Sequence, residues 1–267
     1  MKLSDFGRRF AGSSGILQLM DDLGDALSST SGKTYMLGGG NPAHIPEVQQ
    51  YFRRRMETIL RTRGEFEQII GDYDGPQGET SFIGILARLL KKEYGWDIGP
   101  ENIALTNGSQ TAFFFLFNMF AGRGNYGRGR KHRKILFPLA PEYIGYADMG
   151  LSDDFFTARK PEIELLGDGL FKYHVDFSSL KMTEDIGAIC ISRPTNPTGN
   201  VLTDTEVAKL CSLAEGKSIP VIIDNAYGTP FPNIIFTGAK PVWNKNIVMC
   251  MSLSKLGLPG LRTGIVI

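Results

Sequence analysis

The second half of the chain alternates short apolar runs with segments of helical periodicity. The runs lack apolar–polar alternation, which is typical of strands buried on both faces of a sheet. We therefore predict six strands, at residues 103–105, 134–139, 186–192, 220–224, 247–252 and 263–267. Residues 203–215 predict a crossover helix, with Thr203 as N-cap and Glu206 three residues on. The pattern favours an α/β fold with a mostly parallel sheet and helices on both faces.

The first hundred residues have a different pattern, with amphipathic helical periodicity and little sign of strands. Helices are predicted at 16–27, 46–63 and 79–94, and they either wrap the sheet or begin a second domain. A further helical segment, 113–120, is apolar on nearly every side, so we expect it to be covered all round in the interior.

Composition and charge narrow the class of protein. With 267 residues, 42% of them hydrophobic, the chain can bury a large core as one compact unit. A net charge of +1 gives no overall attraction to nucleic acid or an anionic membrane. The start of the chain has no apolar run after its basic residues, and no stretch approaches the roughly 18 apolar residues of a membrane span, so we expect a cytoplasmic protein.

The basic cluster at 122–134 allows two interpretations, a nucleic-acid patch or a solvated loop, and its glycines favour the loop. No metal site is indicated either. The cysteines at 190, 211 and 250 lie far apart in apolar surroundings, and the histidines at 44, 132 and 174 have no metal-ligand spacing. We expect the cysteines to be buried and reduced.

Polar residues cluster directly after the predicted strands, where ligands bind in open α/β sheets. After residues 103–105 the chain passes through Asn107 and Gly108 to Ser109 and Gln110 at a helix start, where free N–H groups suit a phosphate. An ordinary turn and N-cap is the alternative. In the next cluster Asn196 lies between two prolines, which stiffen the loop, so that the Asn196 side-chain amide can be held in a fixed direction.

Two further clusters carry charged groups. Asp224 ends an otherwise apolar strand, with Tyr227 three residues later; it is either a buried, paired carboxylate or a helix N-cap. Lys255 and Arg262 lie in a loop rich in glycine after another strand. They either converge on an anion or are solvated surface charges.

Taken together, the NPTG loop, the D-x-A-Y strand end and the motif S-x-S-K-x-x-G-x-x-G-x-R resemble the class I, fold-type I, pyridoxal-phosphate-dependent aminotransferases. The resemblance runs from about residue 4 to residue 267. It implies the large domain of that fold at 71–267, and an N-terminal arm with part of the small domain at 1–70. It also implies pyridoxal 5'-phosphate as cofactor, and amino acids and 2-oxo acids as substrates.

The resemblance implies roles for individual residues. Lys255 matches the lysine that carries the cofactor as a Schiff base and moves the substrate proton. Asp224 matches the carboxylate that pairs with the ring nitrogen. Asn196 and Tyr227 match the residues that bond the phenolic oxygen, and Tyr143 matches the aromatic that stacks on the ring.

Phosphate binding is implied for Ser109, Gln110, Ser252 and Arg262, and for Tyr73 toward the neighbouring subunit's cofactor, which implies a homodimer. Substrate binding is implied for Asn196 and for Gly40, which matches the family glycine whose backbone lies against the substrate carboxylate, and the neighbouring Gly39 could share that role.

Several segments, among them LGGGNPAHIPE and IDNAYGTPFPNIIF, are similar nearly line by line to the family's enzymes that exchange amino groups between valine and pyruvate. That implies conversion of L-valine and pyruvate to 3-methyl-2-oxobutanoate and L-alanine. The alternatives are a family member with another amino donor, a lyase with the same cofactor site, or a non-catalytic module of a regulator.

The family's members are longer than this chain. The resemblance implies that the part with the arginine that binds the substrate carboxylate follows residue 267, so we expect the chain alone to be poorly active.

Overall fold

A computed structural model describes residues 2–29, 35, 39–126 and 130–267. Its main feature is a sheet with strand order β1-β10-β9-β8-β7-β3-β2, in which β4 also pairs with β3. The strands are β1 (Ala104–Asn107), β2 (Gly122–Asn125), β3 (Arg130–Phe137), β4 (Phe156–Ala158), β7 (Ile186–Ser192), β8 (Val221–Asp224), β9 (Ile247–Ser252) and β10 (Thr263–Val266). The six predicted strands are confirmed as β1, β3, β7, β8, β9 and β10, with ends that differ by a few residues.

The central pairs β3–β7, β7–β8 and β8–β9 are parallel, as predicted. Strand β10 runs antiparallel to both of its neighbours, β9 and β1. The connection from β9 to β10 covers only residues 253–262, too short for a crossover helix, so the chain turns back on itself. This short connection carries Lys255 and Arg262.

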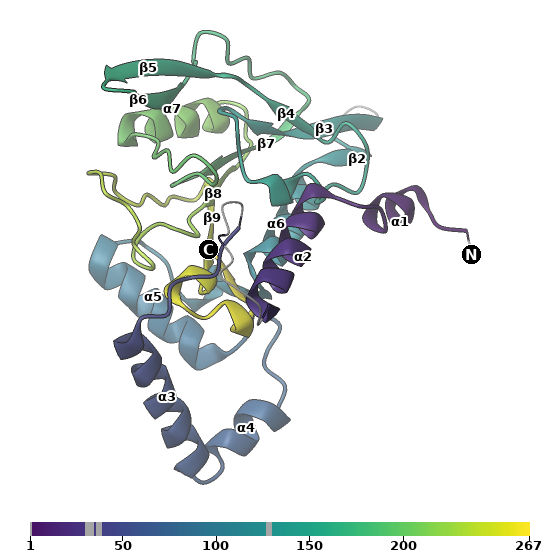
Figure 1. Ribbon diagram of the computed structural model, residues 1–267. Helices are drawn as coiled ribbons and strands as arrows, with labels where there is room; N and C mark the ends of the chain where they lie inside the picture. Colours follow the sequence, from purple (N-terminus) through teal and green to yellow (C-terminus); the bar gives the residue numbers. More distant parts are fainter. Residues whose placement is uncertain (1, 30–34, 36–38, 127–129) are drawn as a thin grey trace.

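Helices cover both faces of the sheet, as Figure 1 shows with the sheet nearly edge-on. Helices α5 (Thr80–Tyr94) and α7 (Asp204–Glu215) pack on one face, and α6 (Ser109–Phe120) packs on the other. The residues of β7 are buried throughout, as expected for a central strand with both faces covered. The α/β architecture therefore follows the predicted layers.

Helix α6 departs from one expectation. Phe113 and Phe117 are buried against the sheet, but Phe115 is 55% exposed and Met119 is 67% exposed. The prediction that this segment is covered all round is wrong for the described part of the chain, because the helix packs on the sheet along one side only.

The glycine-rich basic cluster is also not the loop that the sequence favoured. Strands β2 and β3 form an antiparallel hairpin in which Gly122 pairs with Arg133. Backbone pairing needs no apolar alternation, so the pattern gave no sign of it. Two basic side chains of β3 have acidic partners: Lys131 bonds Glu184 at 2.9 Å, and Lys134 bonds Asp154 at 2.7 Å.

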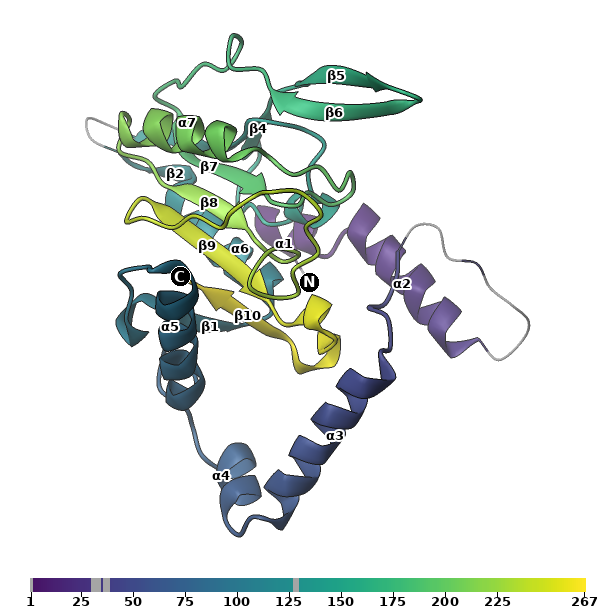
Figure 2. The same cartoon turned by 90° about the vertical axis from the view of Figure 1, so that its left-hand side faces the viewer.

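A second hairpin, β5 (Pro161–Gly167) with β6 (Leu170–Val175), was not predicted and lies above α7 in Figure 2. The predicted crossover helix is confirmed as α7. Thr203 Oγ1 accepts from the Glu206 N–H while the Glu206 side chain accepts from the Thr203 N–H, which is the predicted capping box.

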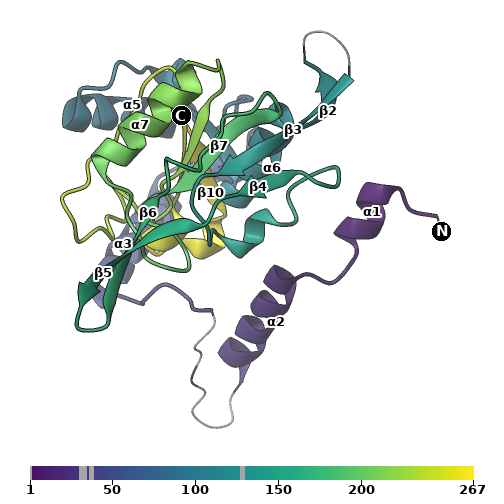
Figure 3. The ribbon, with the colours of Figure 1, turned by 90° about the horizontal axis from the view of Figure 1, so that it is seen from above.

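The N-terminal helices are α1 (Asp5–Phe10), α2 (Gly15–Ser28), α3 (Pro46–Arg61) and α4 (Glu65–Gly71). None of these four contributes a buried residue, and Figures 2 and 3 show them extending away from the sheet. The predicted helices at 16–27, 46–63 and 79–94 are confirmed as α2, α3 and α5. The division near residue 70 stays a prediction. Among the described residues, no helix has both the length and the apolar character needed to cross a bilayer.

Candidate active site

The carboxyl ends of β7, β8 and β9 bring polar residues together at one edge of the sheet. Ser192 at the end of β7 pairs in register with Asp224 at the end of β8, and Ser252 ends β9 next to Gly264 of β10. Parallel strands end on the same side, so residues that lie tens of positions apart in the sequence become neighbours here. This edge is the candidate active site.

Asp224 accepts two hydrogen bonds, from the Tyr146 hydroxyl at 2.6 Å and from the Ala226 N–H at 2.9 Å. Burial raises the pKa of Asp224, while these two donors and the positive charge of Lys255 act in the opposite direction. The residues after Asp224 are all described up to β9, and none of them begins a helix. Asp224 is therefore a half-buried, hydrogen-bonded carboxylate rather than a helix N-cap.

Lys255 lies in η3 (Ser254–Leu256), in the short return between β9 and β10. Its Nζ lies 5.5 Å from the centre of the Tyr227 ring. Burial and the nearby Arg262 lower the pKa of Lys255, and the opposite charge of Asp224 raises it. The amine is thus shifted toward its neutral form, which is the form that acts as a nucleophile or base.

Asn196 and Tyr227 meet across the site from different strands. Burial and Asp224 raise the pKa of Tyr227, and a hydrogen bond with the Asn196 side chain lowers it. The two residues come from the loops after β7 and β8, so the sheet edge brings an amide and a phenol into one bonded pair.

The start of α6 and the guanidinium of Arg262 form a corner at this edge of the sheet. Gly108 has φ +84° and packs so closely on Arg262 that a Cβ there would lie 2.3 Å from the guanidinium Nη2. A Cβ on Gly264 would lie 2.5 Å from the Ser109 backbone nitrogen. Only glycines at these two positions let the guanidinium and β10 approach the helix start.

Two backbone N–H groups of this corner, those of Ser109 and Gln110, have no hydrogen-bond acceptor within the described part of the chain. Free N–H groups at a helix start, combined with the charge of Arg262, form a site of positive potential. The serine at 252 lies nearby at the end of β9, where its Oγ accepts from the Ser254 N–H at 3.1 Å.

Tyr143 is held by its own loop. Its ring lies directly over Gly145, where a Cβ would come within 2.4 Å of it. The Gln110 side chain donates to the Gly145 carbonyl at 3.0 Å, and so ties this loop to α6. Burial, Asp224 and Tyr227 raise the pKa of Tyr143, so its ring lies within the same charged environment.

Three predicted site residues do not join this group. Tyr73 is fully exposed, Gly39 packs against Leu19, and Gly40 has no heavy atom within 4 Å of a Cβ placed on it. Their predicted roles in binding phosphate and substrate carboxylate therefore stay predictions.

The sequence interpretation missed Glu142, Tyr146 and Ser192. Ser192 Oγ lies 2.5 Å from Glu142 Oε2 and 3.2 Å from the Tyr146 hydroxyl, which donates to Asp224. Ser192 could have been identified from the sequence, because it is the polar residue that ends the apolar run of β7. Glu142 and Tyr146 lie in the loop after the predicted strand 134–139, but nothing in the pattern showed that this loop folds back to Ser192 and Asp224.

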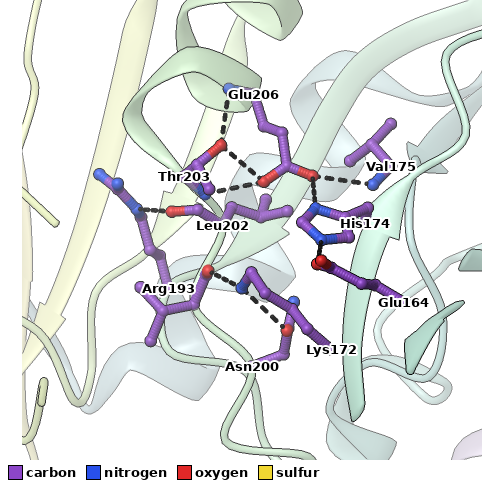
Figure 4. A network of polar contacts seen from close by, with 10 residues as sticks. Glu164, Lys172, His174, Val175, Arg193, Asn200, Leu202, Thr203 and Glu206 are labelled. Atoms are coloured by element: carbon purple, nitrogen blue, oxygen red, sulfur yellow. Dashed lines mark hydrogen bonds and ion pairs between the residues drawn. The ribbon is translucent and has the colours of Figure 1, made fainter. Parts of the chain in front are cut away.

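A second polar network fixes the loop that carries Asn196 (Figure 4). Arg193 donates to the Leu202 carbonyl at 2.7 Å and to the Lys240 carbonyl at 2.6 Å, and it pairs with Asp204. Lys172 of β6 donates to the Val201 carbonyl at 2.7 Å. The loop is therefore held at its base by α7 and from outside by the β5–β6 hairpin.

Glu206 is the centre of this network. It is 7% exposed and accepts from the N–H groups of Val175 and Thr203, at 2.9 and 2.8 Å, and from His174 at 3.3 Å. His174 in turn bonds Glu164 at 2.8 Å. Burial opposes ionisation of Glu206, but the hydrogen bonds outweigh it and its pKa is lowered.

Glu206→Ala is expected to lower the free energy of unfolding by about 2 to 4 kcal/mol, because it removes a cap and leaves a buried N–H without an acceptor. Since the folded-state pKa is depressed, this contribution is present above the unfolded pKa and is lost as pH falls through the folded value. Urea unfolding at neutral and acid pH measures it. The exposed Glu215→Ala, in the last turn of α7, is the control; an equal effect from both substitutions contradicts the assignment.

Comparisons with known proteins find aminotransferases. The sequence profile of "Aminotransferase class I and II" matches residues 170–267. The chain is 58% identical over 267 residues to the valine–pyruvate aminotransferase of Escherichia coli K12, covering 100% of this chain and 63% of the relative. The chain thus spans less than two thirds of that relative's length.

Solved structures agree. A putative amino-acid aminotransferase from Psychrobacter arcticum 273-4 superposes with a TM-score of 0.93 at 48% identity, over 100% of this chain and 64% of the other. The valine–pyruvate aminotransferase of Salmonella typhimurium LT2 superposes with a TM-score of 0.81 at 57% identity, over 95% of this chain and 60% of the other. The fold of the chain is that of these enzymes.

Proposed function

We propose that the chain belongs to the class I and II aminotransferase family, as its similarity to aminotransferases supports, and that it forms the cofactor-binding part of an enzyme that transfers the amino group of L-valine to pyruvate. The products are 3-methyl-2-oxobutanoate and L-alanine. The observation that carries the proposal is the convergence of Lys255, Asp224 and the Asn196–Tyr227 pair at one edge of the sheet. The identity to the E. coli enzyme supports the choice of substrates.

The chemistry of the site fits pyridoxal 5'-phosphate. An amine shifted toward its neutral form suits the aldehyde, and a buried carboxylate suits a protonated ring nitrogen. The Asn196–Tyr227 pair suits a phenolic oxygen, and Tyr143 offers an aromatic face to the ring. When bound, the cofactor supplies an electron sink for the substrate's Cα–H bond.

The corner between the start of α6 and Arg262 suits the phosphate group of the cofactor. We propose that the N–H groups of Ser109 and Gln110, the hydroxyl of Ser252 and the guanidinium of Arg262 hold it. A phosphate at this corner also brings negative charge beside Arg262, which offsets part of the repulsion that lowers the pKa of Lys255.

Lys255 has two tasks in this proposal. Its neutral amine binds the cofactor covalently, and once substrate has taken that place the freed amine accepts the Cα proton and returns it to another carbon. Asp224 keeps its negative charge next to the ring nitrogen, and Tyr146 and the Ala226 N–H hold that carboxylate in position. Asn196 and Tyr227 orient the ring.

The finer assignments are proposals of the same kind. We propose that residues 71–267 form the large domain, that the enzyme is a cytoplasmic homodimer, and that Gly39, Gly40 and Asn196 contact the substrate. The fully exposed ring of Tyr73 supports a role toward a neighbouring subunit, since nothing in the described part of its own chain covers it.

The test is a screen of amino donors with pyruvate as acceptor, detecting alanine formed and ammonia released. It uses this chain and a version extended to the full length of its relatives. Valine is expected to be the preferred donor, with parallel double-reciprocal plots, because one cofactor alternates between two forms. A strong preference for aspartate refutes the substrate assignment but leaves the enzyme class intact, and release of ammonia without alanine favours a lyase.

A further inference from the structure

Glu142 is an acidic residue at the site for which the proposed mechanism has no task. It follows Pro141 in the loop after β3 and is partly buried. Its Oε1 accepts from the Ser192 N–H at 3.0 Å, and its Oε2 lies 2.5 Å from Ser192 Oγ. Both oxygens therefore face the end of β7 and not the solvent.

Four side chains form a continuous line from Glu142 to Asp224. Ser192 Oγ lies 3.2 Å from the Tyr146 hydroxyl, and that hydroxyl lies 2.6 Å from Asp224 Oδ2. The line thus contains three oxygen–oxygen contacts: Glu142 to Ser192, Ser192 to Tyr146, and Tyr146 to Asp224. The carboxylates stand at its two ends.

The number of protons along this line determines how many of its three contacts are hydrogen bonds. Ser192 and Tyr146 contribute one proton each, so two ionised carboxylates leave one of the three contacts without a proton. A single extra proton on either carboxylate gives every contact one donor and one acceptor. All the bonds then point the same way, toward the carboxylate that remains ionised.

The groups around the two carboxylates determine whether Glu142 or Asp224 is the ionised one. Lys255 faces Asp224, and the Ala226 N–H donates to the other Asp224 oxygen. Among the described residues, none of the groups that act on the charge of Glu142 is a cation. The titratable groups near Glu142 are Asp224 on β8, Cys190 on β7, and Tyr143 and Tyr146 in its own loop. The negative charge is therefore favoured at Asp224.

We propose that Glu142 is held as a neutral carboxylic acid, and that its proton starts a hydrogen-bond chain through Ser192 and Tyr146 that fixes the single negative charge of the site on Asp224. Glu142 is then a positioning residue. It acts on Asp224 only through the two hydroxyls. This inference rests on the proposed function for its purpose, namely a carboxylate kept ionised for the ring nitrogen, but its proton arrangement belongs to the chain alone.

The electrostatics are consistent with this arrangement. Burial, and then the charge of Asp224, raise the pKa of Glu142 to about 7 against the hydrogen bonds from Ser192. Because the value is raised, the neutral acid is the main form below about pH 7 and is lost as pH rises through that value.

Infrared spectroscopy of the cofactor-free chain tests the proposal directly. Wild-type protein at about pH 6 is expected to show a carboxylic-acid carbonyl band that disappears with a midpoint near pH 7. Glu142→Gln should lack that band. The control Glu184→Gln, an exposed carboxylate paired with Lys131, should keep it. Absence of the band from wild type, or its loss in Asp224→Asn but not in Glu142→Gln, overturns the proposal.

Cofactor binding gives a second readout on the same variants. Gln is isosteric with the protonated acid and can donate to Ser192 Oγ, so Glu142→Gln should bind pyridoxal phosphate within about twofold of wild type at about pH 6. Glu142→Leu and Ser192→Ala break the chain and should weaken binding about fivefold, the size of one lost hydrogen bond. If Glu142→Gln weakens binding as much as Glu142→Leu, the ionised form of Glu142 is the one that supports binding, and the proposal fails.

The proposed function and the proposal about Glu142 can be refuted independently of each other. A chain that takes up no pyridoxal phosphate refutes the proposed function, while the infrared band still decides the protonation of Glu142. A chain that binds the cofactor but shows no such band keeps its function and loses this inference. Unfolding curves of each variant identify any that fail to fold, and the Glu142→Gln spectrum decides the outcome even if Glu142→Leu is one of them.

Discussion

Lys255→Ala is expected to abolish transamination in the extended enzyme, lowering kcat by about ten thousandfold or more. Loss of a positioned general base alone costs about a hundredfold to ten thousandfold, and this substitution also removes the amine that binds the cofactor. No other lysine can take its place, because none of the others lies at the carboxyl ends of β7, β8 and β9 in the part of the chain that the structure describes. The variant should fold normally, since Lys255 lies in a short 3₁₀ turn and not in the core.

The control is Lys245→Ala, an exposed lysine in the loop before β9, which should leave the rate unchanged. A chemical test accompanies the kinetics: borohydride reduction of the wild-type chain with pyridoxal phosphate should attach the cofactor to the peptide that contains Lys255. Attachment to any other lysine, or unchanged turnover in Lys255→Ala, contradicts the central assignment.

The sheet was predictable because its strands are buried on both faces. A short apolar run such as 186–192 is typical of a strand with both faces covered, and β7 is indeed buried along its whole length. The elements that escaped prediction are those that do not depend on burial. Strands β2 and β5 are held by backbone pairing at the edge or outside the sheet, and their side chains are mostly exposed or only partly buried.

The site was predictable to the extent that a rule of topology applies to it. Asp224 ends a strand, Asn196 and Lys255 lie within a few residues of the end of one, and the structure brings them to the same edge. The direction of β10 was not foreseeable from apolar pattern, which is the same for parallel and antiparallel strands. Glu142 and Tyr146 depend on how one loop folds back over β7, which is a tertiary contact that no local pattern records.

Asp224→Asn is the substitution that separates a catalytic carboxylate from a structural one. The amide Oδ1 can still accept from the Ala226 N–H, and the amide NH2 can donate to the Tyr146 hydroxyl oxygen, so both contacts can persist with the second one reversed in direction. A neutral amide cannot hold a proton on the cofactor's ring nitrogen. Transamination is therefore expected to fall by about a hundredfold to a thousandfold or more, as for loss of a preorganised electrostatic contact.

Stability of the cofactor-free chain should move the other way. Burial raises the pKa of Asp224, so folding favours the protonated form of this carboxyl group. The contribution of Asp224 to the stability of the chain is therefore fully present below its unfolded pKa and is lost as pH rises through its folded pKa. Removing the charge should leave the melting temperature at neutral pH unchanged or higher.

Asp176→Asn is the matched control, because this partly exposed carboxylate accepts from Ser178 and Ser179 and those bonds hold its pKa at about 2. Its charge contributes stability above the unfolded pKa that is lost as pH falls through the folded value. Asp176→Asn should therefore lower the melting temperature at neutral pH and leave transamination intact, the reverse of Asp224→Asn on both measurements. If Asp224→Asn instead melts earlier and keeps its turnover, Asp224 serves the fold, and the ring nitrogen has no partner at the end of β8.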